Sequence, residues 1–237
     1  MSIGLDEQPE GDASLTKKYE GILFDLDGTL VDSLELILSS YRHTMSQHLG
    51  REFPDEEWLN TMGKPLKVQL QSFAESPEQL DKMFHTYVAH NEAHHRQLIR
   101  PFPRMKETVT ALKRAGYRLA VVTSKIRDHA LRELRTCELE GLFDGLVSAS
   151  DVRRPKPDAE PTISGLQSIG VAAVDALLVG DSLFDLLSAR AAGVDTAAAL
   201  WGPFDRIRLG PGKPKYWLEE ASELLPLLGV TSGPRDA

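Results

Sequence analysis

The sequence predicts an α/β protein: a doubly wound parallel sheet with an all-helical module inserted after the first strand. From about residue 117 onward, short apolar strands alternate with helices of ordinary length. Strands in this alternation pair in parallel and are covered by helices on both faces. About 65 residues between the first two strands contain helical patterns and no convincing strand, which is too long for a simple crossover.

Composition limits the class of protein. The 237 residues are 41% hydrophobic and 26% charged, which is ordinary for a globular chain, and the net charge is −8 with a pI near 5.4. This acidity argues against a nucleic-acid or anionic-membrane surface as partner. The single Cys137 excludes an intrachain disulfide and fits a reducing compartment. The first 19 residues lack an apolar core, and no uncharged apolar run approaches the ~20 residues of a membrane span. We expect a cytoplasmic monomer or homodimer.

The first elements follow from local patterns. Residues 1–17 are polar and are expected to be a disordered tail. A strand is predicted over 20–26. Asp32 stands three residues before Glu35, a spacing that predicts an N-cap for a helix over 33–48.

The insert has its own start and stop signals. Helices are expected to begin at Pro54, at Lys64-Pro65 and at Ser76-Pro77. Two prolines at 101 and 103 are typical of the linker that would end the insert. The expected division of the chain is a core over 18–32 and 102–230, a helical module over 33–101, and a tail over 231–237.

The remaining chain alternates as an open sheet requires. The predicted strands cover residues 117–123, 145–149, 176–179 and 194–200. The predicted helices cover residues 105–115, 128–137, 160–169, 183–192 and 216–228.

The end of the first strand is the most informative stretch. Asp25 and Asp27 lie one residue apart, and two such carboxylates repel each other unless a cation or a shared proton is present. Gly28 allows the chain to leave the strand sharply and a ligand to approach, and the Thr29 hydroxyl can donate to a phosphate oxygen. Alone, these residues can equally be an acidic turn or part of a calcium loop, although the latter needs more oxygen ligands nearby.

Polar residues also follow three other strands. Thr123 and Ser124 follow the second strand, Lys156 lies in a proline-flanked loop after the third, and Asp181 and Asp185 follow the fourth. Each has a plain alternative: a helix cap, a solvated lysine, or an acidic first helical turn. Because ligands bind at the carboxyl ends of parallel strands, the joint occurrence predicts one site, and its residue types suit phosphoryl transfer.

In that chemistry Asp25 would be the nucleophile and form an aspartyl-phosphate intermediate. Asp27 would protonate the leaving oxygen and then deprotonate the attacking water. Thr123 and Lys156 would hold the equatorial phosphoryl oxygens, where transition-state charge is spread.

A magnesium ion is the expected cofactor, because it prefers oxygen ligands and joins carboxylate to phosphate. The candidate ligands are Asp25, the carbonyl of Asp27, Asp181 and, through water, Asp185. The metal would offset the carboxylate repulsion and withdraw charge from the phosphoryl group.

These motifs resemble those of the haloacid dehalogenase superfamily, all four of which are present in order over residues 19–228. They are the segment 25–33 (DLDGTLVDS), Thr123, Lys156 within 154–158 (RPKPD), and 180–185 (GDSLFD). The resemblance implies a Rossmann-like core and magnesium. The insert resembles the C1 cap of the branch that contains phosphoglycolate phosphatases, pyrophosphatases and β-phosphoglucomutases.

Two details refine this resemblance. Asp27, which dehalogenase members lack, argues against dehalogenation. The segment 62–66 (MGKPL) resembles the specificity loop of the cap, where Lys64 would reach an anionic substrate end. The chain departs from the family at two places. The family often has Gly-Val where this chain has Arg104-Met105, and Pro where it has Ala159, which weakens assignment to one subfamily.

The expected function is a magnesium-dependent phosphatase acting on a small phosphorylated metabolite, with phosphoglycolate as the leading substrate. Alternatives are inorganic pyrophosphatase, a β-phosphoglucomutase-like phosphotransferase, and a non-enzymatic binding protein. The expected substrate-binding residues are Gly28, Thr29, Ser124 and Lys64.

Overall fold

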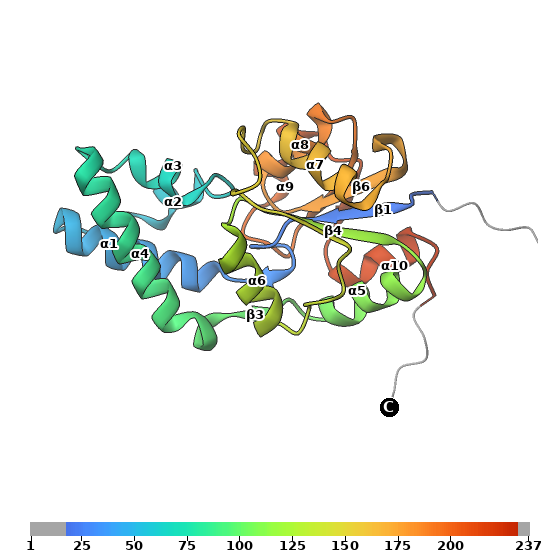
Figure 1. The fold of residues 1–237 in the computed structure, drawn as a ribbon, viewed down its shortest axis with the longest axis horizontal. Coiled ribbons are helices and arrows are strands. Elements are labelled where there is room, and N and C mark those ends of the chain that lie inside the picture. The colour runs from blue at the N-terminus through green and yellow to red at the C-terminus, as the bar shows by residue number, and fades with distance from the viewer. Residues whose placement is uncertain (1–17, 232–237) are drawn as a thin grey trace, which may run out of the picture.

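The computed structural model describes residues 18–231 and contains a six-stranded parallel sheet in the order β5-β4-β1-β6-β7-β8 (Figure 1). Every neighbouring pair in this sheet is parallel. The strands are β1 (Gly21–Phe24), β4 (Arg118–Val122), β5 (Gly145–Val147), β6 (Ala176–Gly180), β7 (Asp195–Ala199) and β8 (Tyr216–Leu218).

Helices cover both faces of the sheet, which confirms the predicted doubly wound fold (Figure 1). The central strand shows why: Ile22 and Phe24 are fully buried on one face and Leu23 on the other, so neither face can meet water. The helices α7 (Glu160–Ile169) and α8 (Leu183–Ala191) cover one face, and α5 (Met105–Arg114), α6 (Arg127–Thr136) and α10 (Leu224–Leu227) cover the other. Shorter elements are α9 (Arg206–Leu209) and the 3₁₀ turns Ala173–Asp175, Gly210–Gly212 and Ala221–Glu223.

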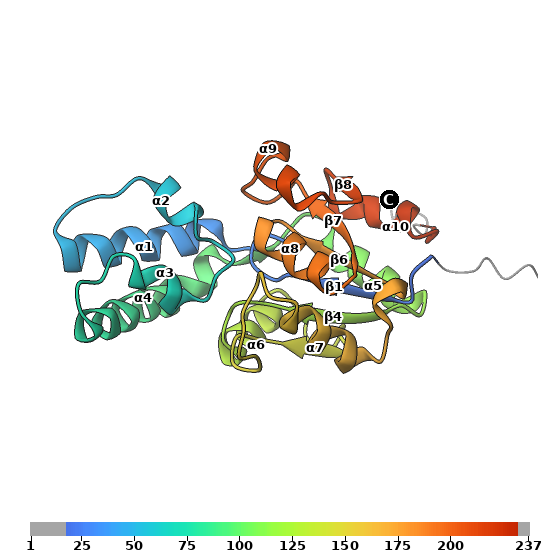
Figure 2. The ribbon, with the colours of Figure 1, turned by 90° about the horizontal axis from the view of Figure 1, so that it is seen from above.

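Four helices form a separate layer beside the carboxyl ends of the strands (Figure 2). Their shared core is aromatic: the fully buried Trp58 lies 4.6 Å from the ring of Tyr41 and 5.7 Å from that of Tyr87, measured between centroids. These helices are α1 (Leu34–Leu49), α2 (Asp55–Leu59), α3 (Leu66–Gln71) and α4 (Pro77–Leu98). The predicted starts of all three later helices are confirmed within two residues. The division into core and cap at 33–101 stays a prediction, which this layering supports.

Two short strands, β2 (Val31–Asp32) and β3 (Arg100–Pro101), pair where the chain passes between the sheet and this helical layer. The pairing is antiparallel, with Val31 opposite Pro101 and Asp32 opposite Arg100. Both crossings are therefore held side by side, although 70 positions separate the paired residues Val31 and Pro101 in the numbering of the chain.

The prediction of a final helix over 216–228 is wrong at its start. Tyr216–Leu218 forms β8, and only the four residues Leu224–Leu227 form an α-helix. Aromatic and branched residues suit a strand, and the otherwise unpaired edge of β7 gives their backbone groups hydrogen-bond partners, including Leu200 N–H to the Leu218 carbonyl at 2.8 Å.

Two predictions around the first strand also need correction. β1 ends at Phe24 rather than at residue 26, so both acidic residues lie in the loop that follows it. The N-cap position of α1 is Ser33, not Asp32, and the Ser33 side chain forms no capping hydrogen bond to this helix in the described part of the chain. The Ser33 hydroxyl donates instead to Asp27 Oδ1 at 2.5 Å, so an active-site contact replaces the cap.

Within residues 18–231, no helix combines the length and the apolar character that crossing a bilayer requires. The expected tails, 1–17 and 231–237, lie outside the described residues apart from Thr231.

Candidate active site

The candidate site lies where the strand order reverses. β1 stands between β4 and β6, so the polar residues after these three strands meet at one edge of the sheet. A cavity of about 330 Å³ separates this edge from the helical layer. Its lining includes six residues predicted from the sequence: Asp25, Asp27, Thr123, Ser124, Lys64 and Asp181.

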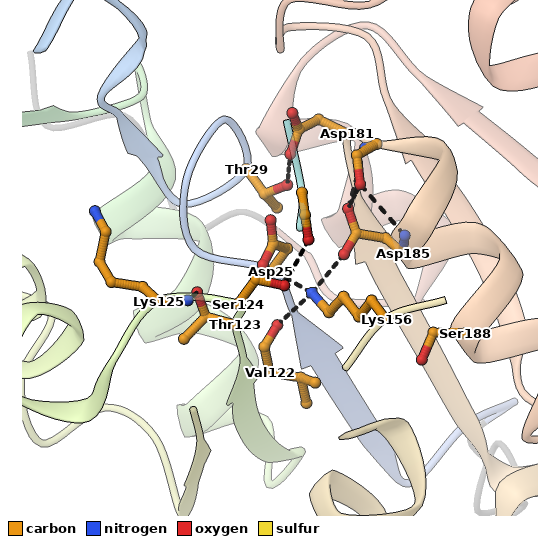
Figure 3. Close-up of polar contacts among 12 residues, drawn as sticks. Asp25, Thr29, Val122, Thr123, Ser124, Lys125, Lys156, Asp181, Asp185 and Ser188 are labelled. Carbon is orange, nitrogen blue, oxygen red and sulfur yellow. Dashed lines mark hydrogen bonds and ion pairs between the residues drawn. The ribbon is translucent and has the colours of Figure 1, made fainter. Parts of the chain in front are cut away.

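The Asp25 carboxylate forms an ion pair with Lys156, which comes from the loop before α7 (Figure 3). The Lys156 ammonium donates to Asp25 Oδ1 at 2.9 Å, to the Val122 carbonyl at 2.7 Å and to Asp185 Oδ1. All three N–H groups are thus engaged within the protein. Lys156 is 3% exposed and does not line the cavity, so its expected contact with a phosphoryl oxygen stays a prediction.

Asp181 is held by the loop after β1. The Thr29 hydroxyl, fully buried, donates to Asp181 Oδ1 at 2.7 Å (Figure 3). Gly28 has φ +79° and lies so close to the carboxylate that an added Cβ would stand 2.2 Å from Asp181 Oδ2. Neither Gly28 nor Thr29 lines the cavity, and their expected role in substrate binding stays a prediction.

Asp185 has two partners that differ in kind. Its Oδ1 accepts from Lys156, and its Oδ2 accepts from the backbone N–H and hydroxyl of Ser182 in a capping box at the start of α8. The alternative of an acidic first helical turn is therefore correct for Asp185. The same carboxylate nevertheless lies close to those of Asp25 and Asp181.

Asp25, Asp181 and Asp185 together fit a divalent cation. One oxygen of each lies within 4.8 Å of the others, and all three residues are buried. Burial and the nearby Asp185 raise the pKa of Asp25 to about 7, although Lys156 opposes this shift. Burial and Asp25 likewise raise the pKa of Asp181 well above its usual value. One lysine does not balance three buried carboxylates, and a bound Mg²⁺ would supply the missing positive charge.

Asp27 also lines the cavity, but its carboxylate does not belong to the group formed by Asp25, Asp181 and Asp185. Its Oδ1 accepts from Ser33 at 2.5 Å and from the Lys125 ammonium at 2.8 Å. Thr123 lines the cavity next to it, and its hydroxyl accepts the Lys125 backbone N–H at 3.1 Å.

The cavity is bounded on its far side by the α2–α3 loop. The Ser124 hydroxyl donates to the Gly63 carbonyl at 2.5 Å, which joins the end of β4 to this loop. Next to Gly63, the Lys64 ammonium lies 5.2 Å from the centroid of the Phe184 ring. Lys64 forms no ion pair with any carboxylate of residues 18–231, so its charge is available to an anion in the cavity.

Comparison with known proteins identifies the family of this chain. Residues 22–199 match the family model of haloacid dehalogenase-like hydrolases. The chain belongs to this family. The resemblance inferred from the four motifs is therefore confirmed.

Relatives within the family are similar over nearly the whole chain. The pyrophosphatase PpaX of Bacillus velezensis is 37% identical over 214 residues, which is 90% of this chain and 98% of that protein. The pyrophosphatase PpaX of Anoxybacillus flavithermus is 36% identical over 211 residues, covering 89% and 97%. These relatives support the expectation of a hydrolytic enzyme with phosphatase chemistry.

Solved structures show the same fold. A protein described as a predicted phosphoglycolate phosphatase from Haemophilus somnus superposes with a TM-score of 0.82 at 24% identity, covering 90% of this chain and 99% of that one. A haloacid dehalogenase-like hydrolase from Streptococcus pneumoniae has a TM-score of 0.76 at 28% identity, covering 89% and 98%.

Sequence reasoning missed two charged residues of this hydrolase site, Lys125 and Glu133. Lys125 directly follows the predicted Ser124, and its ammonium contacts both Asp27 and Glu133. The signal that was available was the helical spacing of the α6 residues, which puts Glu133 on the same buried face as Ala130 and Leu134. A carboxylate on a buried face needs a cation, and a lysine at a strand end is a natural partner.

We predict that Mg²⁺ stabilises this protein more at pH 8 than at pH 5. Without metal, the unfolding free energy should fall as the pH rises from about 4 to about 7, because folded Asp25 retains a proton that the unfolded chain has released. Magnesium at about 100 times its dissociation constant should add about 2.7 kcal/mol where the carboxylates are ionised. Thermal unfolding with Mg²⁺ and with EDTA at the two pH values measures this.

The matched variants for that measurement are Asp181→Asn and Asp128→Asn. The first removes one repelling carboxylate, so it should raise the Tm of the metal-free protein at pH 8 and abolish the response to Mg²⁺. The exposed Asp128 should respond like the wild type. Equal Mg²⁺ effects at both pH values would contradict the assignment of the metal site.

We predict that Gly28→Ala loses the response to Mg²⁺ and the hydrolytic activity, whereas Gly141→Ala retains both. The two glycines have similar positive φ angles, +79° and +83°, so both substitutions should cost about 1–3 kcal/mol of backbone strain. Only the methyl group at Gly28 meets Asp181, since no atom of the described residues lies within 4 Å of a Cβ at Gly141. Phosphate release and Mg²⁺-dependent Tm distinguish the two, and an active Gly28→Ala protein would refute the role of this close contact.

Proposed function

We propose that this protein is a Mg²⁺-dependent phosphatase that works through a phosphorylated Asp25. The observation that supports this most directly is the state of the Asp25 carboxylate. One oxygen is held by Lys156, and the other accepts no hydrogen bond from residues 18–231 while the residue lines the cavity. A carboxylate held at one oxygen and free at the other is suited to attack a phosphorus atom placed in the cavity.

Asp27 is the proposed acid and base. It lines the same cavity, and its carboxylate is separate from the three-carboxylate cluster, so it can exchange a proton without competing for the metal. In the first half-reaction it would protonate the oxygen that leaves phosphorus. In the second it would take a proton from the water that hydrolyses the aspartyl-phosphate.

Asp25, Asp181 and Asp185 would hold the Mg²⁺, and the expected carbonyl ligand from Asp27 completes the proposed set. When bound, Mg²⁺ supplies positive charge that lowers the repulsion between an anionic nucleophile and an anionic phosphate. Lys156 sets the orientation of Asp25 for this reaction, and Thr29 sets that of Asp181.

The proposed substrate is a small phosphate that carries a second anionic group, with inorganic pyrophosphate as the first candidate. Two observations support it: the named activity of relatives that are 36–37% identical over nearly their whole length, and the position of Lys64 in the cavity without a carboxylate partner among residues 18–231. Phosphoglycolate has the same pattern of charges and is the second candidate. The likeness to a predicted phosphoglycolate phosphatase, at 24% identity, bears on the fold alone.

We expect Asp25→Asn to abolish hydrolysis, because an amide cannot form the acyl-phosphate. The measurement is phosphate release from pyrophosphate, phosphoglycolate, sugar phosphates and nucleotides, each with Mg²⁺ and with EDTA. Loss of more than about 10³-fold in the variant is expected for every substrate that the wild type accepts. Activity that survives in folded Asp25→Asn protein would exclude the covalent mechanism, and activity that needs a bisphosphate primer would identify a mutase.

We expect Lys64→Met to raise the KM for pyrophosphate and phosphoglycolate about tenfold, equivalent to about 1.4 kcal/mol of binding. Ethyl phosphate, which has no second anionic group, should lose less than about twofold. Lys82→Met, which removes an exposed lysine from α4, is the control and should leave all three values unchanged. An equal loss for all three substrates would show that Lys64 does not recognise the second anion.

A further inference from the structure

Lys125 occupies an unusual electrostatic position beside the active site. Its ammonium contacts Asp27 Oδ1 at 2.8 Å on one side and Glu133 Oε1 on the other. The side chains are 15% exposed for Lys125, 18% for Asp27 and 1% for Glu133. Burial alone would lower the pKa of Lys125, but Asp27 and Glu133 raise it above its usual value, so the lysine keeps its charge.

This arrangement is costly for the fold. Burying a lysine–glutamate pair requires removing both charges from water, and an apolar pair of similar volume is often as stable or more so. The second oxygen of Glu133, Oε2, is buried and has no hydrogen-bond partner among residues 18–231, which adds to the cost. A contribution to stability therefore does not explain why these residues stand here.

The contact determines which oxygen of Asp27 is available for chemistry. Oδ1 accepts two hydrogen bonds, one from the Ser33 hydroxyl at 2.5 Å and one from Lys125 at 2.8 Å. Oδ2 accepts none from residues 18–231, and Asp27 lines the cavity. The two donors come from different elements, Ser33 from the start of α1 and Lys125 from the end of β4, so they prevent rotation of the carboxylate about its Cβ–Cγ bond.

We propose that Lys125 is a positioning residue that orients Asp27 so that Oδ2 carries the transferred proton, and that Glu133 fixes Lys125 for this purpose. This inference rests on the proposed function. As the Asp25 oxygen forms its bond to phosphorus and the bond to the leaving oxygen breaks, Oδ2–H gives its proton to that oxygen. Oδ2 then takes a proton from water as the water oxygen attacks phosphorus, which releases inorganic phosphate and free Asp25.

If Asp27 is misplaced, the reaction rate should fall most for substrates whose leaving group must be protonated as it departs. We therefore compare kcat/KM for p-nitrophenyl phosphate, which has a stable leaving anion, with that for ethyl phosphate, which has an unstable one. In Lys125→Met the value for ethyl phosphate should fall about 100-fold, within the usual contribution of general acid catalysis. The value for p-nitrophenyl phosphate should fall less than about fivefold.

Three further variants make the result specific. In an Asp27→Asn background, Lys125→Met should add less than about threefold, because the group that it positions is already gone. Lys125→Met combined with Glu133→Gln removes the uncompensated buried charge and serves if the single variant folds poorly; it should show the same dependence on the leaving group. Lys106→Met, which breaks an exposed pair with Glu138, is the control and should match the wild type.

Equal losses for both substrates would overturn the proposal, since they would indicate direct phosphate binding or a general structural role. Full additivity with Asp27→Asn would overturn it as well. A crystal structure of Lys125→Met gives an answer independent of activity: the Asp27 carboxylate should rotate or occupy more than one orientation. An unchanged Asp27 would refute the inference, whereas wild-type protein that hydrolyses no phosphate ester would refute only the proposed function.

Discussion

The site depends on one ammonium group placed among three oxygens. Lys156 joins Asp25 after β1, Asp185 in the first turn of α8 and the Val122 carbonyl at the end of β4. Without it, the buried carboxylates of Asp25 and Asp185 would lie close together with no cation between them. Because these groups come from three separate parts of the chain, the same contact that offsets their repulsion also sets the relative positions of the strand ends.

The single positive charge of Lys156 does not neutralise the three carboxylates of Asp25, Asp181 and Asp185. This imbalance favours the binding of a cation. Burial, together with the neighbouring carboxylates, raises the pKa of Asp25 to about 7 and that of Asp181 above its usual value, so the protein without metal favours the protonated form of both groups. A divalent cation that binds to the three carboxylates would lower the free energy of the folded protein. The three buried carboxylates thus lower the stability of the metal-free fold, and metal binding would raise it again.

A second set of ion pairs, which is partly buried, contacts a different carboxylate. Lys156 contacts Asp25 and Asp185, whereas Lys125 contacts Asp27 and Glu133. The two aspartates of the motif, one residue apart, are therefore held by separate lysines. In the proposed mechanism this separation lets one carboxylate act as nucleophile and the other as acid and base.

The sequence by itself determined five of the six strands of the sheet, the helical insert and most of the residues proposed for the site. Periodicity and turn residues are local signals, and the carboxyl ends of parallel strands must meet, so Asp25, Thr123 and Asp181 could be assigned to one place from the chain alone. The tertiary structure decided what each side chain contacts. Thr29 bonds Asp181 instead of facing the cavity, Tyr216–Leu218 pairs with β7 instead of beginning a helix, and Lys125 joins Asp27 to Glu133. These outcomes rest on contacts between residues distant in the chain, whose energies depend on burial and charge pairing that a one-dimensional pattern does not contain.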